Sequence, residues 1–222
     1  MTTEKLDIRK TITEGIGYGL KNFFPLLLMV VLYLVTFWIP YLNVGTTIGV
    51  CKAIIGIGRG EVVNPVSIFD KDNFKNLGGF FLLLGLVTIG TTAAAAFLFF
   101  PALVIGIAWS FAIYFLIDKK VSPLKALGLS YDATYGNKWR IFFVGLICGV
   151  AVCIICAILG AIPKVGVLLM VLAVVLSYAV IVAVDGVMYD FFSKKADAIM
   201  EERSAACSGK NEEVVDEAEP KI

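Results

Sequence analysis

The sequence predicts an all-α membrane protein in which a bundle of helices crosses the lipid bilayer. Hydrophobic residues make up 59% of the 222 residues and charged residues only 17%, whereas a soluble domain carries about 25% charged residues. The mean hydropathy is +0.89. A helix crosses the hydrocarbon layer with about 20 apolar residues. Four stretches of the chain carry no Asp, Glu, Lys or Arg, namely Asn22–Cys51, Asn76–Ile117, Ile141–Pro163 and Val165–Val184.

Prolines divide these stretches into six transmembrane spans arranged as three helical hairpins. The hairpins turn near Pro40, Pro101 and Pro163. The expected spans cover residues 22–39, 43–58, 78–99, 102–117, 141–163 and 165–184. They form one transmembrane domain over residues 22–192. An amphipathic helix at residues 1–21 precedes this domain, and a helical extension with an acidic, disordered tail follows at residues 193–222.

Basic residues predict the orientation of the spans. Four lysines and arginines precede the first hairpin, three separate it from the second, five separate the second from the third, and five follow the third. Apart from Lys52, which lies within a span, only Lys164 falls on the opposite side. Because positive residues accumulate on the cytoplasmic side, we expect both termini to be cytoplasmic.

The segments ahead of the hairpins have the pattern of helices that lie on the cytoplasmic surface of the membrane. In the first segment, apolar residues recur every four positions, at Ile8, Ile12, Ile16 and Leu20, which makes one apolar stripe along a helix. Before the third hairpin, Ser122 is suited to cap a helix that begins at Pro123 and ends near Gly136.

A short motif recurs at the start of each hairpin. Residues 18–24, 74–81 and 135–143 each contain a lysine that precedes a pair of phenylalanines. Two explanations remain open. The chain either contains three copies of one hairpin, or each helix start independently uses lysine and aromatic side chains as interfacial anchors.

Two charged residues fall inside the predicted spans. Lys52 and Asp185 both lie about 8 to 10 Å inside the inner boundary, where an ionised side chain costs up to about 3 kcal/mol unless it is paired or reaches water. We therefore consider a Lys52–Asp185 pair, with the alternative that Lys52 snorkels to the cytoplasmic interface. Arg59, Glu61 and Asp118 are candidates for a polar cluster at the inner interface.

Small residues predict the closest helix contacts. In the fifth span they recur four positions apart, at Gly145, Gly149, Cys153, Ala157 and Ala161. The fourth span repeats the spacing with Ala102, Gly106 and Ser110. Such faces allow helix backbones to approach closely in lipid. We expect them to pack within the monomer, with a homodimer interface as the alternative.

The residues that are absent exclude several kinds of chemistry. The chain has no histidine, so histidine-dependent triads and histidine-ligated metals are excluded. The five cysteines are odd in number and mostly lie in apolar stretches, which argues against a set of disulfides. Cys153 and Cys156 form one Cys-x-x-Cys pair, but the chain has no second Cys-x-x-Cys pair to complete a metal site. We expect no metal, no cofactor, no enzymatic activity and no nucleic-acid partner. Basic residues at 119–125 and 138–140 are suited to contact anionic lipid head groups.

Part of the chain is similar to a known family. Residues 109–118, which read Trp-Ser-Phe-Ala-Ile-Tyr-Phe-Leu-Ile-Asp, together with residues 122–130 and 136–142, carry the resemblance, and residues 59–61 and 189–192 add to it. They resemble a broad group of bacterial multi-pass proteins related to the membrane domain attached to some glycerophosphoryl diester phosphodiesterases. The resemblance implies a bacterial cytoplasmic (inner) membrane protein with this number of spans. It implies no activity, because the phosphodiesterase catalytic domain is not part of this chain.

The sequence therefore predicts a non-catalytic membrane scaffold, assembly or regulatory component. It would meet a protein partner through its cytoplasmic helices or its acidic tail. The alternative is a small-molecule or ion transporter or channel that uses Lys52 and Asp185.

Overall fold

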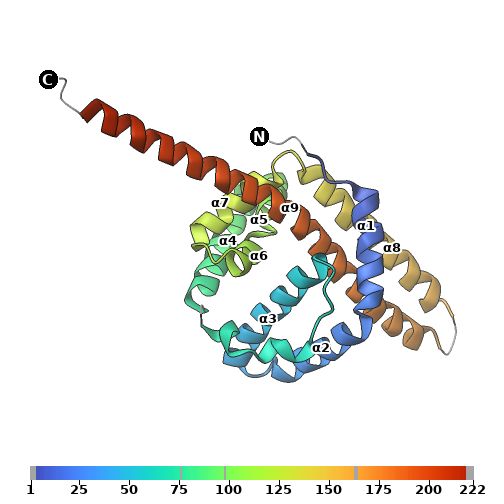
Figure 1. The fold of residues 1–222 in the computed structure, drawn as a ribbon. Helices are drawn as coiled ribbons and strands as arrows, with labels where there is room; N and C mark the ends of the chain where they lie inside the picture. The colour runs from blue at the N-terminus through green and yellow to red at the C-terminus, as the bar shows by residue number, and fades with distance from the viewer. Residues whose placement is uncertain (1–3, 76, 98, 163–164, 219–222) are drawn as a thin grey trace.

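The computed structural model describes residues 4–75, 77–97, 99–162 and 165–218, and its regular structure within them is helical throughout (Figure 1). In chain order the elements are α1 (Ile8–Lys21), α2 (Phe23–Thr36), α3 (Pro40–Gly58), the 3-10 helices η1 (Pro65–Phe69) and η2 (Lys71–Phe74), α4 (Leu77–Phe97), α5 (Phe99–Trp109), α6 (Ala112–Asp118), α7 (Pro123–Thr134), α8 (Lys138–Gly160) and α9 (Gly166–Ala218). The all-α prediction is confirmed for these residues.

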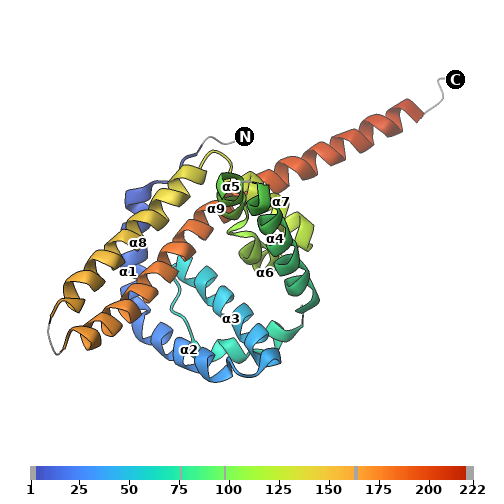
Figure 2. The same ribbon diagram turned by 180° about the vertical axis from the view of Figure 1, so that it is seen from behind.

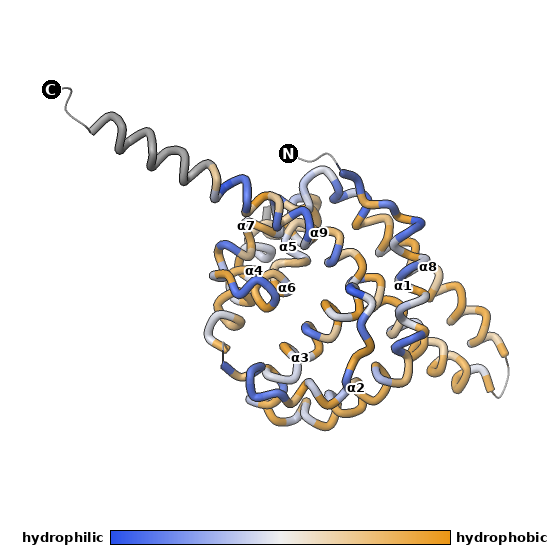
Figure 3. The backbone as a smooth tube through the Cα atoms, in the orientation of Figure 1, coloured by the Kyte–Doolittle hydropathy of each residue, from blue (hydrophilic) through white to orange (hydrophobic). Residues whose placement is uncertain are grey.

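Five segments are long and apolar enough to cross a membrane. They are Pro40–Gly58, Leu77–Ala96, Phe100–Asp118, Lys138–Gly160 and Gly166–Ala205. Helices α1 and α2 form a sixth candidate when they are taken together, bent by 73° at their junction. Figure 3 shows hydrophobic residues along α2, α8 and the first part of α9, and hydrophilic residues at the start of α1. These segments support the class of membrane protein.

The first predicted span differs from the observed helices. Helix α2 has 14 residues, which is about 21 Å of helix against a hydrocarbon core of about 30 Å. Helix α1 packs along α9. Gly15 and Gly19 make this contact possible, because a Cβ at Gly19 would lie 2.9 Å from the carbonyl oxygen of Ala179. Of the apolar stripe on α1, Ile8 and Ile12 pack against the core whereas Ile16 and Leu20 are exposed.

The centre of the bundle consists of α3, α6 and α9. Helices α3 and α9 cross at Gly58 and Gly186, where the two backbones touch. The rings of Phe115 on α6 and Tyr189 on α9 are fully buried and pack edge to face with centroids 5.3 Å apart. The segment η1–η2 folds back along α3, with Ile68 lying on Gly49. Helices α2, α4 and α8 pack outside this centre.

The small-residue face of the fifth span does not make the predicted contact. Gly145, Gly149, Cys153, Ala157 and Ala161 are all exposed. Helix α8 instead meets the core through a face of larger side chains that includes Ile141 and Val144. The physical reason is that α1 and α3 already occupy the faces of α9 where a close backbone approach is made. The expectation of packing within the monomer is therefore wrong for α8.

The corresponding face of the fourth span is also not a close helix contact. Ala102 and Gly106 are half-buried, no atom lies within 4 Å of where a Cβ of Gly106 would be, and Ser110 is exposed. The tight contact of this hairpin lies elsewhere, because the ring of Trp109 packs directly on Gly90. The segment 102–117 is also broken, since α5 ends at Trp109 and α6 begins at Ala112.

The crossing of α3 and α9 predicts a large effect for one methyl group. In Gly186→Ala the new Cβ would lie 2.9 Å from the backbone nitrogen of Gly58 and would touch the carbonyl oxygen of Ile54. We expect this overpacking to lower the free energy of unfolding by about 1–3 kcal/mol, measured by denaturation in a mild detergent. Gly145→Ala is the matched control, because nothing lies within 4 Å of its Cβ. Equal stabilities of the two variants would contradict the crossing.

Candidate functional site

Asn22 is a fully buried asparagine at the break between α1 and α2. Its Oδ1 accepts a hydrogen bond from the backbone nitrogen of Val63 at 2.9 Å, and its Nδ2 donates to the carbonyl oxygens of Glu61 at 3.2 Å and Tyr18 at 3.1 Å. One side chain therefore ties the segment before η1 to the start of α2, across 41 residues of sequence.

Asn137 makes the same arrangement at the start of α8. It is 2% exposed. Its Oδ1 accepts from the backbone nitrogen of Leu6 at 2.9 Å, and its Nδ2 donates to the carbonyl oxygen of Glu4 at 3.3 Å. We call this arrangement an asparagine clamp. In each clamp, Asn22 or Asn137 donates to the backbone C=O of one residue and accepts from the backbone N–H of the residue two positions later. The N-terminal segment is thus held by a helix that begins more than 130 residues further along the chain.

The clamp occurs twice in the described residues, so two of the three connecting segments share one local structure. After each clamped segment a side chain caps the next helix, since Asp7 accepts from the backbone nitrogen of Arg9 and Asn64 from that of Val66. Packing also repeats around a ring, with α1 on α9, η1 on α3 and α7 on α6. Asn76, the asparagine of the second motif, lies outside the described residues.

A third buried asparagine, Asn73, holds Lys52. The Nδ2 of Asn73 donates to the carbonyl oxygens of Ser67 at 3.0 Å and Ile68 at 3.1 Å, and its Oδ1 accepts from the Nζ of Lys52 at 2.7 Å. Within the described part of the chain no ion pair joins Lys52 to Asp185. The structure therefore does not bring together the pair considered from the sequence.

The predicted polar cluster at residues 59, 61 and 118 forms in part. A nitrogen of the Arg59 guanidinium lies 2.6 Å from Oδ2 of Asp118. The hydroxyl of Tyr189 donates to the same oxygen at 2.7 Å. Burial lowers the pKa of Arg59, but the hydrogen bond and charge of Asp118 raise it, and the net change is upward. The ends of α3 and α6 meet the middle of α9 at this cluster.

Glu61 does not join the Arg59–Asp118 pair. Its backbone carbonyl accepts from Asn22, and its carboxylate lies beside Gly56 on α3. Sequence reasoning did not select Tyr189 or the asparagines as site residues. The only signal for Asn22 and Asn137 was their place in the repeated motif, and nothing in the sequence indicated a hydroxyl bound to Asp118.

A cavity of about 530 Å³ lies between α3, η2, the start of α4 and the connection from α6 to α7. Lys52, Lys75 and Lys120 line it together with a single carboxylate, Asp72. The Nζ of Lys75 lies 2.6 Å from Oδ1 of Asp72. The hydrogen bond and charge of Lys75 lower the pKa of Asp72, and Lys52 and Lys120 lower it further. Positive charge therefore exceeds negative charge in this cavity.

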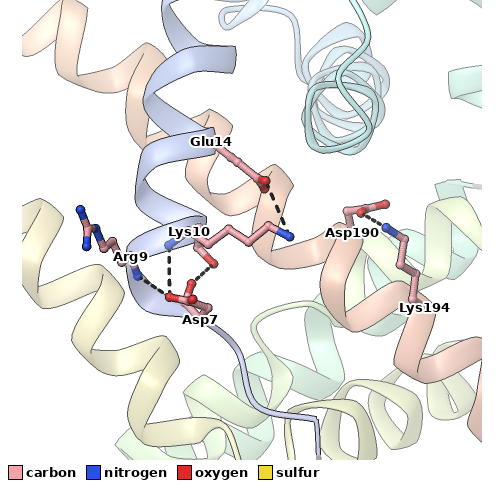
Figure 4. Close-up of polar contacts among 7 residues, drawn as sticks. Asp7, Arg9, Lys10, Glu14, Asp190 and Lys194 are labelled. Atoms are coloured by element: carbon pink, nitrogen blue, oxygen red, sulfur yellow. Dashed lines mark hydrogen bonds and ion pairs between the residues drawn. The ribbon is translucent and has the colours of Figure 1, made fainter.

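A second cavity, of about 610 Å³, lies between α1 and α9 and has balanced charges. Figure 4 shows its ion pairs, with Lys10 directed to Glu14 on α1 and Lys194 to Asp190 on α9. The Lys194 and Asp190 charges are 2.7 Å apart. Because its four basic residues are matched by four acidic residues, this cavity offers less attraction for an anion than the first. Among the described residues, no three potential metal ligands gather.

Comparison of the chain with protein-family models, with curated proteins and with solved structures finds no match. The resemblance to the membrane domain of glycerophosphoryl diester phosphodiesterases therefore stays a prediction, and functional inference rests on the geometry of this chain.

The Asn137 clamp predicts how the N-terminal segment is held. In Asn137→Ala the Leu6 amide loses its acceptor, and a buried unpaired group costs about 1–3 kcal/mol. We expect a loss of stability of this size and faster hydrogen exchange at Leu6. Asn43→Ala is the matched control, because the Nδ2 of Asn43 is buried without a hydrogen-bond partner among the described residues. Unchanged exchange at Leu6 in Asn137→Ala would contradict the clamp.

Proposed function

We propose that this chain is a non-catalytic component of the bacterial inner membrane, acting as a scaffold, assembly or regulatory protein that presents a helix to a protein partner. One observation carries the proposal. Helix α9 is continuous from Gly166 to Ala218, and it begins among the apolar helices and projects far beyond the rest of the bundle (Figures 1 and 2). Its residues 201–205 are all exposed.

The base of the projecting helix is firmly attached to the bundle. The Nζ of Lys119 lies 2.7 Å from a carboxylate oxygen of Asp197. The Nζ of Lys195 donates to the carbonyl oxygen of Tyr135 at 2.9 Å, and Arg203 pairs with Asp132. These contacts from α6–α7 fix the direction in which α9 leaves the bundle. A helix held in a fixed direction suits a scaffold, because a preorganised surface loses less conformational entropy when a partner binds.

An isolated helix in water is only marginally stable, because most helical stability in proteins comes from packing. Residues 201–205 are all exposed, so apart from the Arg203–Asp132 ion pair this part of α9 has little such packing. A partner that packs against this part of α9 would supply it. This reasoning favours a helix-binding protein partner at the membrane surface.

The alternative is a transporter or channel that uses Lys52 and Asp185. Lys52 binds Asn73, and the cavity of about 530 Å³ that Lys52 lines does not include Asp185. The proposal of a scaffold does not use that pair and requires no metal or cofactor.

Photo-crosslinking in native membranes tests the proposed partner surface. A photoreactive amino acid at Ser204, on the projecting part of α9, is expected to give a discrete protein adduct. The same amino acid at Ile158, an exposed apolar residue of α8, is the matched control and is expected to label lipid only. The double change Glu201→Lys and Glu202→Lys should reduce the Ser204 adduct severalfold. No protein adduct from any position between 201 and 205 would contradict the proposal.

A further inference from the structure

The lysine-lined cavity of about 530 Å³ brings together cations from three segments of the chain. Lys52 comes from the middle of α3, Lys75 follows η2, and Lys120 precedes α7. Asp72 is the one carboxylate in the lining, and Lys75 already pairs with it. Within the described residues, neither Lys52 nor Lys120 has a carboxylate partner. An anion in the cavity would relieve the repulsion among these charges.

The backbone of Lys120 gives a second, independent observation. Lys120 has a φ of 51°, and it is the only non-glycine residue with a positive φ in the described part of the chain. The corresponding connection from α3 to η1 uses Gly60 at its own positive φ, 80°. Glycine adopts this conformation at little cost, whereas a residue with a side chain does not. Such backbone strain gathers at functional positions, which makes Lys120 a candidate functional residue.

The remaining lining of the cavity suits the phosphate end of an amphiphile. Ser122 stands immediately before α7 and makes no capping hydrogen bond with its side chain, so its hydroxyl is available as a donor. Ile48, Phe80 and Leu116 provide an apolar wall beside the lysines. The next residues of α4, Phe81 and Leu82, are exposed apolar side chains, as expected where a helix enters lipid. Charge and apolar surface therefore lie side by side.

We propose that this cavity binds a phosphate group through Lys52, Lys75 and Lys120. Lysine ammonium groups are common phosphate ligands, acting as point charges. Two sources share this chemistry, namely the head group of an anionic lipid and a soluble phosphate compound. The phosphate site is separate from the projecting part of α9. A negative result for phosphate binding would therefore leave the proposed partner surface unaffected, and a negative result for the partner surface would leave the phosphate site unaffected.

The experiment uses the full chain in an uncharged detergent. Native mass spectrometry measures the retention of added phosphatidylglycerol and phosphatidylcholine, and equilibrium dialysis measures the binding of radiolabelled inorganic phosphate. Lys52→Gln and Lys120→Gly each remove one ammonium group. Each change is expected to weaken binding about fivefold, because a basic residue near an anionic surface contributes on the order of 1 kcal/mol. Lys120→Gly also relieves the positive φ, so its thermal stability should equal or exceed that of the natural chain.

Lys71→Gln is the matched control, since Lys71 is an exposed neighbour that does not line the cavity. Preference for phosphatidylglycerol over phosphatidylcholine, lost in the two cavity variants and kept in Lys71→Gln, supports a lipid head group. Binding of inorganic phosphate with the same dependence, without lipid preference, supports a soluble phosphate. The proposal is overturned if the natural chain binds neither probe, or if the cavity variants bind as well as Lys71→Gln.

Discussion

The structure depends on one constraint, which is that a backbone polar group buried among packed helices needs a hydrogen-bond partner. Three buried asparagines, Asn22, Asn73 and Asn137, provide partners for such groups. A side-chain amide suits this role because it can donate and accept at once. Asn22 and Asn137 use both functions on a segment distant in sequence, and thereby fasten each connecting segment to the start of another helix.

The fastened segments place several charged residues close to the ends of α3 and α6. Arg59, Asp118 and Tyr189 join these two ends to the middle of α9. The same set of connections surrounds the cavity that Lys52 and Lys120 line, and fixes the direction in which α9 leaves the bundle. Both proposals, a partner surface on α9 and a phosphate site beside α3, therefore rely on a scaffold made by main-chain hydrogen bonds to asparagine.

Composition and periodicity predicted the helical class, and the start of α7 at Pro123 was predicted correctly, although the side chain of Ser122 at its N-cap makes no capping hydrogen bond. Composition and periodicity could not predict which face of a helix is buried against another helix. Gly15 and Gly19 on α1 have the same four-residue spacing as Gly145 and Gly149 on α8, yet only the first pair is buried, because spacing defines a face and not what lies opposite. Local sequence patterns could likewise not predict the hydrogen-bond partners of Asn137 and Lys52, because these partners lie 131 and 21 residues away along the chain.

The central claim is that the three connecting segments share one side of the membrane. The direct measurement is labelling of single cysteines, introduced at Lys5, Val62 and Lys125 in a cysteine-free background, with a maleimide that does not cross membranes. The account predicts that all three react in inside-out vesicles and that all three are protected in intact cells. Labelling of these positions from opposite sides would contradict it, because Asn22 and Asn137 hold two of the segments to the bundle and α7 packs on α6 and α9 of the same bundle.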